Sequence, residues 1–194
     1  MSRLDPPVGG VLFDCYGTLI DILTDERDIA TYRYLSRWLV YQGVGVAPEN
    51  LRDLYTSRVR EALDLTGETY PEVRVEDVFS GICTEYALWN IDTVRLGIEA
   101  ARAFRAASIR RLGIIEKSKK LLDLLSTKKI GVVSNGQRVF SECEMRALGL
   151  YNQSGFVIFS SDLGYQKPDA RIYAAALGKM ELPARDVLFI GDNT

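Results

Sequence analysis

The chain has 194 residues, of which 47% are hydrophobic, enough for one domain or for a core domain with a small second one. Its 24 basic and 26 acidic residues give a net charge of −2, which provides no general attraction for nucleic acid or an anionic membrane. Histidine is absent, which excludes Ser-His-Asp and Cys-His catalysis, so carboxylates must carry any acid or base chemistry.

The sequence also indicates the cellular compartment in which the protein is expected. No stretch approaches the roughly 20 apolar residues of a membrane span, and the N-terminus lacks the apolar core of a signal peptide, so we expect a cytoplasmic protein without membrane contact. The cysteines are odd in number and widely spaced, which fits neither a disulfide framework nor a zinc site. We expect reduced thiols that serve mainly in packing, at Cys15, Cys83 and Cys143.

The first predicted element is a strand that ends at a carboxylate. Residues 11–19 read Val-Leu-Phe-Asp-Cys-Tyr-Gly-Thr-Leu, so Asp14 follows an apolar run and precedes a turn at Gly17. A rigid strand that aims a carboxylate, next to a small residue that lets backbone amides approach an anion, suits covalent catalysis. The same pattern is also that of an ordinary strand that enters a turn.

The next segment, residues 22–110, changes to helical periodicity. Apolar residues three or four apart predict a first helix between Thr24 and Gly43, a second from Pro48 to Gly67, a third over 75–89 and an alanine-rich fourth over 93–109. The aromatic residues on these helices are predicted to be mainly core, because periodic apolar residues face inward. We interpret the segment as an inserted helical bundle.

After this insert, strands and helices alternate. Helices are predicted over 116–126, 137–148 and 170–177, and strands over 130–133, 156–160 and 187–190. Such alternation indicates an α/β fold with a parallel sheet and right-handed crossovers.

Polar residues follow four of the predicted strands. Besides Asp14 they are Ser134-Asn135-Gly136, Lys167-Pro168 and Gly191-Asp192-Asn193. The carboxyl ends of parallel strands line one crevice, so these groups are expected to converge there.

In this order the motifs resemble the haloacid dehalogenase-like hydrolase superfamily. The resemblance is carried by Asp14-Cys15-Tyr16-Gly17-Thr18-Leu19, Ser134-Asn135-Gly136, Lys167-Pro168-Asp169 with Ile172-Tyr173, and Gly191-Asp192-Asn193. It implies a Rossmann-like core made of residues 1–21 and 111–194, with residues 22–110 as an inserted helical cap.

The resemblance also implies roles for these residues in hydrolysis of a small anionic substrate. Asp14 would be the nucleophile that forms an aspartyl ester, and Lys167, with Pro168 starting the next helix, would offset charge in the transition state. Ser134 and Asn135 would hydrogen-bond the bound anion or cap the next helix, and both are compatible. The substrate would contact Tyr16, Thr18, Gly136 and Tyr173.

Two residues separate the subfamilies. In phosphatases that resemble this chain, Asp192, Asp14 and the Tyr16 carbonyl would bind magnesium, whose preference is for hard oxygen ligands. Tyr16 and the spacing of Tyr173 from Lys167 instead resemble metal-independent 2-haloacid dehalogenases. We favour magnesium-dependent phosphate monoester hydrolysis, with the dehalogenase as the alternative. A catalytically silent binding protein or an inactive fragment is the alternative of another class.

The chain stops at Thr194, directly after the last motif. The family carries a further acidic residue, a helix and a strand beyond it, so we expect that the C-terminal part of the core is missing. An uncovered sheet edge favours association, and a homodimer would complete it.

Overall fold

A computed structural model describes residues 8–192 of the chain. Two compact units are present. The core unit consists of the residues up to Ile22 together with those from Leu112 onward, and the helical unit consists of Leu23–Arg111.

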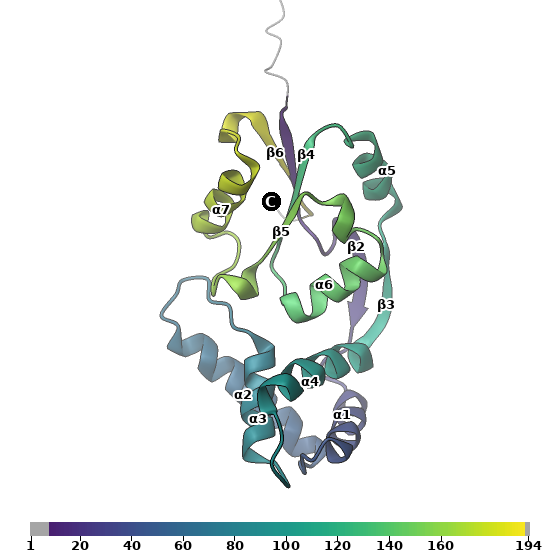
Figure 1. Ribbon diagram of the computed structural model, residues 1–194, viewed down its shortest axis with the longest axis vertical. Coiled ribbons are helices and arrows are strands. Elements are labelled where there is room, and N and C mark those ends of the chain that lie inside the picture. The colour runs from purple at the N-terminus through teal and green to yellow at the C-terminus, as the bar shows by residue number, and fades with distance from the viewer. Residues whose placement is uncertain (1–7, 193–194) are drawn as a thin grey trace, which may run out of the picture. The chain divides into compact units, whose positions relative to one another are not determined.

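The core unit is built on a four-stranded parallel sheet of order β5-β4-β1-β6 (Figure 1). The strands are β1 (Gly10–Phe13), β4 (Lys129–Ser134), β5 (Phe156–Phe159) and β6 (Val187–Ile190). Phe13 pairs with Val132 on one side and with Ile190 on the other. This register places Asp14, Ser134 and Gly191 at the same edge of the sheet, and the predicted parallel α/β fold is confirmed.

Helices cover both faces of this sheet: α5 (Glu116–Leu124), α6 (Arg138–Ala147) and α7 (Ala170–Met180). Val11 and Phe13 belong to a buried cluster with Leu122 of α5 and Met145 of α6. Leu12 points to the opposite face, where it joins residues of α7 in a second cluster. Figure 1 shows α7 on one side of the sheet and α5 and α6 on the other. Successive side chains of β1 point to opposite faces of the sheet, so this strand contributes to the hydrophobic core on both sides.

The described part of the core unit also contains short 3₁₀ helices: η1 (Tyr151–Gln153), η2 (Ser160–Asp162) and η3 (Ala184–Asp186).

Two helix starts differ from the prediction. The N-cap of α6 is Gln137, so neither Ser134 nor Asn135 caps that helix. Pro168 does not begin α7, because Asp169 accepts a hydrogen bond from the Arg171 amide at 2.9 Å and is itself the N-cap. A carboxylate satisfies the free amides of a first helical turn, which explains this choice.

A second, two-stranded sheet was not predicted. It pairs β2 (Ile20–Thr24) with β3 (Ile109–Ile114), and the division between the two units falls within both strands. Sequence analysis placed residues 22–24 and 109–110 of these strands in the helical insert and the others in the core. Since β2 extends to Thr24, the first helix starts later than expected, with Asp28 as its N-cap.

The helical unit contains α1 (Ile29–Tyr41), α2 (Pro48–Leu65), α3 (Val75–Glu85) and α4 (Thr93–Ser108). Its core is aromatic: the Tyr55 ring stacks on Phe79 at 4.9 Å, and Phe104 contacts both rings. Trp89 was expected in this core but is 56% exposed, because α3 ends at Glu85. Within the described residues, no helix has the length and apolar character needed to cross a membrane.

Candidate active site

Asp14 is held at the carboxyl edge of the sheet by its backbone and its side chain. Its amide donates to the Ile190 carbonyl at 2.8 Å, which continues the pairing of β1 with β6. Its Oδ1 atom accepts the Cys15 amide at 2.6 Å and lies 2.6 Å from Lys167 Nζ. The Asp14 and Lys167 side chains are only 18% and 10% exposed, so solvent screens this ion pair weakly.

The second carboxylate oxygen of Asp14 has a different environment. Among the described residues, Oδ2 takes part in no hydrogen bond and no ion pair. A Cβ placed on Gly191 would lie 3.8 Å from it, so the backbone of the loop after β6 passes close by. The carboxylate therefore has one oxygen bound to the protein and one oxygen available for chemistry.

Asn135 acts on the backbone of Lys167. Its Nδ2 atom donates to the Lys167 carbonyl at 3.0 Å, and its Oδ1 atom accepts the Lys167 amide at 2.7 Å. Both ends of the Asn135 amide are thus engaged, and they tie the loop after β4 to the loop that carries Lys167. The Lys167 ammonium also lies 5.5 Å from the centre of the Phe189 ring.

A cavity of about 350 Å³ opens at this edge of the core unit. Five predicted site residues line it together with Pro168 and Phe189: Asp14, Tyr16, Asn135, Lys167 and Tyr173. Sequence reasoning missed Phe189, which lies inside a strand and looked like ordinary core. The Tyr173 ring meets Phe189 edge-on at 5.5 Å. Burial, and then the charge of Asp14, raise the pKa of Tyr173, so it remains a neutral phenol at neutral pH.

Three of the residues predicted to contact the substrate anion do not line this cavity. Ser134 is fully buried beside the Cys15 thiol, and the Thr18 hydroxyl is buried without a hydrogen-bond partner among the described residues. The Gly136 amide donates to Ser160 Oγ at 3.0 Å and so is already engaged. Their roles toward an anion stay predictions.

The Tyr16 side chain is fixed through its hydroxyl. It is hydrogen-bonded to Ser141 Oγ at 2.8 Å and to the Glu144 carboxylate. Ser141 and Glu144 lie on α6 and are buried. The sequence contained no signal for this contact, because 125 residues separate Tyr16 from Ser141.

Asp192 lies against the loop that follows Asp14. Gly17 has φ +77°, and a Cβ at this position would be 2.1 Å from Asp192 Oδ2. Only a residue without a side chain permits this approach. Asn193, the last residue of the predicted motif, lies outside the described residues. Over residues 8–192 no group of three or more Cys, Asp or Glu side chains is arranged to hold a metal ion. The predicted magnesium ligands are not a group of this kind, because only two of them are carboxylates and the third is the Tyr16 carbonyl.

Cys15 is a packing residue, as predicted. It is fully buried, and burial is the main reason why its thiol pKa rises to about 12. The negative charge of Asp14 adds to this rise. A thiol that stays protonated is a poor nucleophile.

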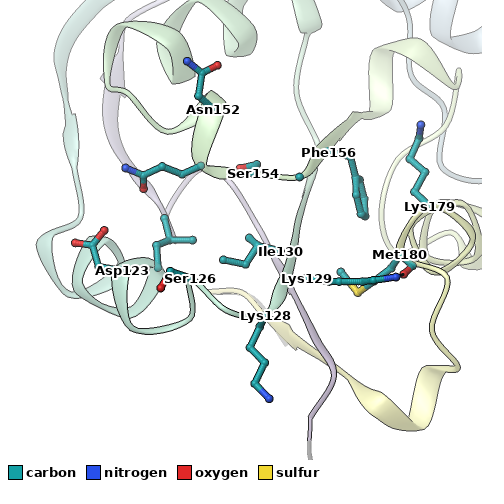
Figure 2. Close-up of a pocket in the computed structure, with 13 residues that line it drawn as sticks. Asp123, Ser126, Lys128, Lys129, Ile130, Asn152, Ser154, Phe156, Lys179 and Met180 are labelled. Carbon is teal, nitrogen blue, oxygen red and sulfur yellow. Dashed lines mark hydrogen bonds between the residues drawn. The ribbon is translucent and has the colours of Figure 1, made fainter.

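A second cavity, of about 580 Å³, lies at the opposite end of the sheet, where β4 and β5 begin (Figure 2). Its polar lining includes Lys128, Lys129 and Lys179, but Figure 2 shows that Lys128 and Lys179 point in different directions. Lys129 Nζ donates to the Met180 carbonyl at 2.8 Å. The lysines therefore do not converge on one ligand, and the smaller cavity remains the candidate active site.

Comparison with known proteins agrees with the motifs at the strand ends. Residues 8–194 match the haloacid dehalogenase-like hydrolases. The chain belongs to the haloacid dehalogenase-like hydrolase family. A curated relative, haloacid dehalogenase-like hydrolase domain-containing protein 3 of Danio rerio, is 38% identical over 65 residues. This haloacid dehalogenase-like match covers 34% of the chain and about a quarter (26%) of the relative's length.

Solved structures of haloacid dehalogenase-like proteins share the fold. A 2-haloacid dehalogenase from Pseudomonas syringae is 22% identical with a TM-score of 0.64, over 96% of this chain and 78% of that one. A phosphatase from Thermococcus onnurineus is 18% identical with a TM-score of 0.53, over 95% and 77%. A magnesium-bound putative hydrolase from Bacillus subtilis is 21% identical with a TM-score of 0.50, over 97% and 79%. Their differing activities leave the subtype of this haloacid dehalogenase-like hydrolase open.

Proposed function

We propose that this hydrolase transfers a group from a small anionic substrate to Asp14 and then to water, and that its preferred reaction is magnesium-dependent hydrolysis of phosphate monoesters. The observation that carries the proposal is the Asp14 carboxylate, with Oδ1 bound to Lys167 at 2.6 Å and Oδ2 uncommitted among the described residues. An oriented carboxylate beside a fixed cation is suited to nucleophilic attack on an anionic substrate.

In the first step Asp14 Oδ2 attacks phosphorus, the bond from phosphorus to the leaving oxygen breaks, and that oxygen keeps the electron pair. The Lys167 ammonium, less than one-fifth exposed like its partner, offsets the negative charges of the carboxylate and the phosphoryl group. Tyr173 and Phe189 present rings to the cavity and limit access of water. In the second step water attacks the aspartyl phosphate and releases phosphate and the free carboxylate.

The residues near Asp14 fit a magnesium ion. Asp14, Asp192 and the Tyr16 carbonyl supply hard oxygen ligands, and the missing side chain of Gly17 makes the room that Asp192 occupies. The loop after β1 has two carboxylates beside it, those of Asp14 and Asp192. Lys167 is paired with Asp14, so the negative charge of Asp192 remains. A bound magnesium ion would offset the remaining negative charge and that of the phosphoryl oxygens.

The alternative is metal-independent dehalogenation of 2-haloacids. It is favoured by the Tyr16 hydroxyl, which is engaged with α6, and by Tyr173 in the cavity. A halide leaves without a proton, so neither hydroxyl would have to act as an acid.

Other parts of the proposal concern the whole protein. We assign the helical unit, Leu23–Arg111, the role of a cap that excludes water during the first step. A cytoplasmic setting, association as a homodimer and the absence of nucleic-acid partners complete the proposal.

Parallel assays test these activities. Phosphate release from p-nitrophenyl phosphate and halide release from 2-chloropropionate are measured with and without magnesium for the parent chain, Asp14→Asn and Asp123→Asn. Asp123 is a control because it lines the distant cavity. We expect magnesium-dependent phosphate release that Asp14→Asn abolishes and Asp123→Asn preserves. Magnesium-independent halide release would establish the dehalogenase, and no turnover of either compound would favour a silent binding protein.

A further inference from the structure

The hydroxyl of Tyr16 is enclosed in a buried network on α6. Ser141 and Glu144 are three positions apart, so their side chains share one face of the helix, and they are 0% and 5% exposed. The Tyr16 hydroxyl is hydrogen-bonded to both of them, to Ser141 Oγ at 2.8 Å and to the Glu144 carboxylate, so two side chains of α6 hold it.

The backbone at Gly136 packs against both the Tyr16 ring and the Ser141 side chain. A Cβ on Gly136 would lie 2.7 Å from Ser141 Oγ and 3.1 Å from Tyr16 Cε2. The backbone therefore packs directly against the ring edge and the serine. With its hydroxyl tied to α6 and its ring against Gly136, Tyr16 contributes a fixed wall to the cavity that contains Asp14.

Two other polar side chains of this cavity are engaged as well. Lys167 is paired with Asp14, and Asn135 binds the Lys167 backbone at both ends. The Tyr173 ring meets the Phe189 ring edge-on at 5.5 Å. The Tyr16 hydroxyl, held by α6, is therefore not presented to the cavity as a proton donor for an alkoxide leaving group.

We propose that Glu144 and Ser141 are positioning residues that withhold the Tyr16 hydroxyl from the cavity, and that the site therefore selects phosphorylated substrates whose leaving group departs as a stable anion. Aryl and acyl phosphates meet this condition and alkyl phosphates do not. In the selected reaction the bond from Asp14 to phosphorus forms, the bond to the leaving oxygen breaks, and no proton is transferred. Water later hydrolyses the aspartyl phosphate and gives its proton to solvent. This inference rests on the proposed phosphatase function.

The test compares three substrates of similar shape: p-nitrophenyl, phenyl and benzyl phosphate. Since general acid catalysis is worth about 10²- to 10⁴-fold, we expect kcat/KM to fall by about that factor from p-nitrophenyl to benzyl phosphate. Tyr16→Phe should leave this ratio unchanged, as should Tyr41→Phe, a control at a ring that is 85% exposed. A ratio near one in the parent chain, or a ratio that grows in Tyr16→Phe, would overturn the proposal, because the hydroxyl would then be acting as the acid.

Paired variants at Glu144 test the positioning role. Glu144→Gln keeps an oxygen that accepts from Tyr16, whereas Glu144→Leu removes it. We expect KM for phenyl phosphate to stay near the parent value in Glu144→Gln and to rise in Glu144→Leu with little change in kcat. Equal damage in both variants would refute positioning and point to the charge of Glu144 instead.

A measurement without turnover separates this inference from the proposed function. The Tyr16 hydroxyl proton, shielded by buried partners, should give a slowly exchanging downfield proton resonance that is lost in Tyr16→Phe and retained in Asp14→Asn. If the resonance is present but no phosphate ester is hydrolysed, the proposed function fails. If it is absent while Asp14-dependent turnover persists, the network on α6 is wrong.

Discussion

The substitution Gly17→Ala separates the structural role of a loop glycine from its role toward Asp192. Gly17 has φ +77°, where a side chain costs about 1–2 kcal/mol. For a chain of this size each kcal/mol lowers Tm by roughly 2–4 °C, so a decrease of about 2–8 °C is expected. Gly164→Ala is the matched control, since Gly164 has φ +79° but no described atom lies within 4 Å of its added Cβ. Both variants should lose similar stability in thermal unfolding monitored by circular dichroism.

Only Gly17→Ala should change metal binding. Its Cβ would lie 2.1 Å from Asp192 Oδ2, and the exposed carboxylate would have to move away. Loss of a group that orients a metal ligand typically lowers affinity about 10- to 100-fold, so magnesium affinity in isothermal titration should fall by that factor. Equal magnesium affinity in Gly17→Ala and Gly164→Ala would refute the assignment of Asp192 as a ligand. Much greater destabilisation by Gly17→Ala would show that the fold, rather than Asp192, absorbs the clash.

Three further predictions concern the core unit. Lys167→Met should lower kcat by about 10²- to 10³-fold, because it removes the fixed cation 2.6 Å from Asp14. Steady-state kinetics on p-nitrophenyl phosphate measure this, and an unchanged kcat would contradict it. Asn135→Ala should reduce kcat while the Lys167 side chain remains, since two hydrogen bonds to the Lys167 backbone are lost; a change confined to KM would instead indicate direct substrate contact. Iodoacetamide at pH 8 should label the exposed Cys143 and spare the buried Cys15, because a thiol pKa of about 12 keeps the Cys15 thiolate scarce below pH 11. Mass spectrometry of the labelled peptides measures this difference. Modification of Cys15 in the native protein would contradict its burial.

Short-range patterns in the sequence predicted much of the fold. Buried parallel strands are continuous apolar runs, and Asp14 was recognisable because a carboxylate directly follows one of them. Surface helices carry an apolar residue every three or four positions, which revealed the helical unit. The strand pair β2 and β3 was missed because short strands next to helices carry little periodic signal. Trp89 was misplaced because the periodic pattern continues past the end of α3.

In the candidate site too, some features could be predicted from the sequence and others depend on the tertiary structure. The identity and order of Asp14, Lys167 and Asp192 are properties of the sequence, since each follows a strand that a parallel sheet brings to one edge. Which atoms meet is decided only by the tertiary structure. Asn135 binds the Lys167 backbone, and Glu144 holds Tyr16 from a helix 128 positions away. Such contacts depend on how loops and helix faces pack in three dimensions, and no local pattern of residues encodes them.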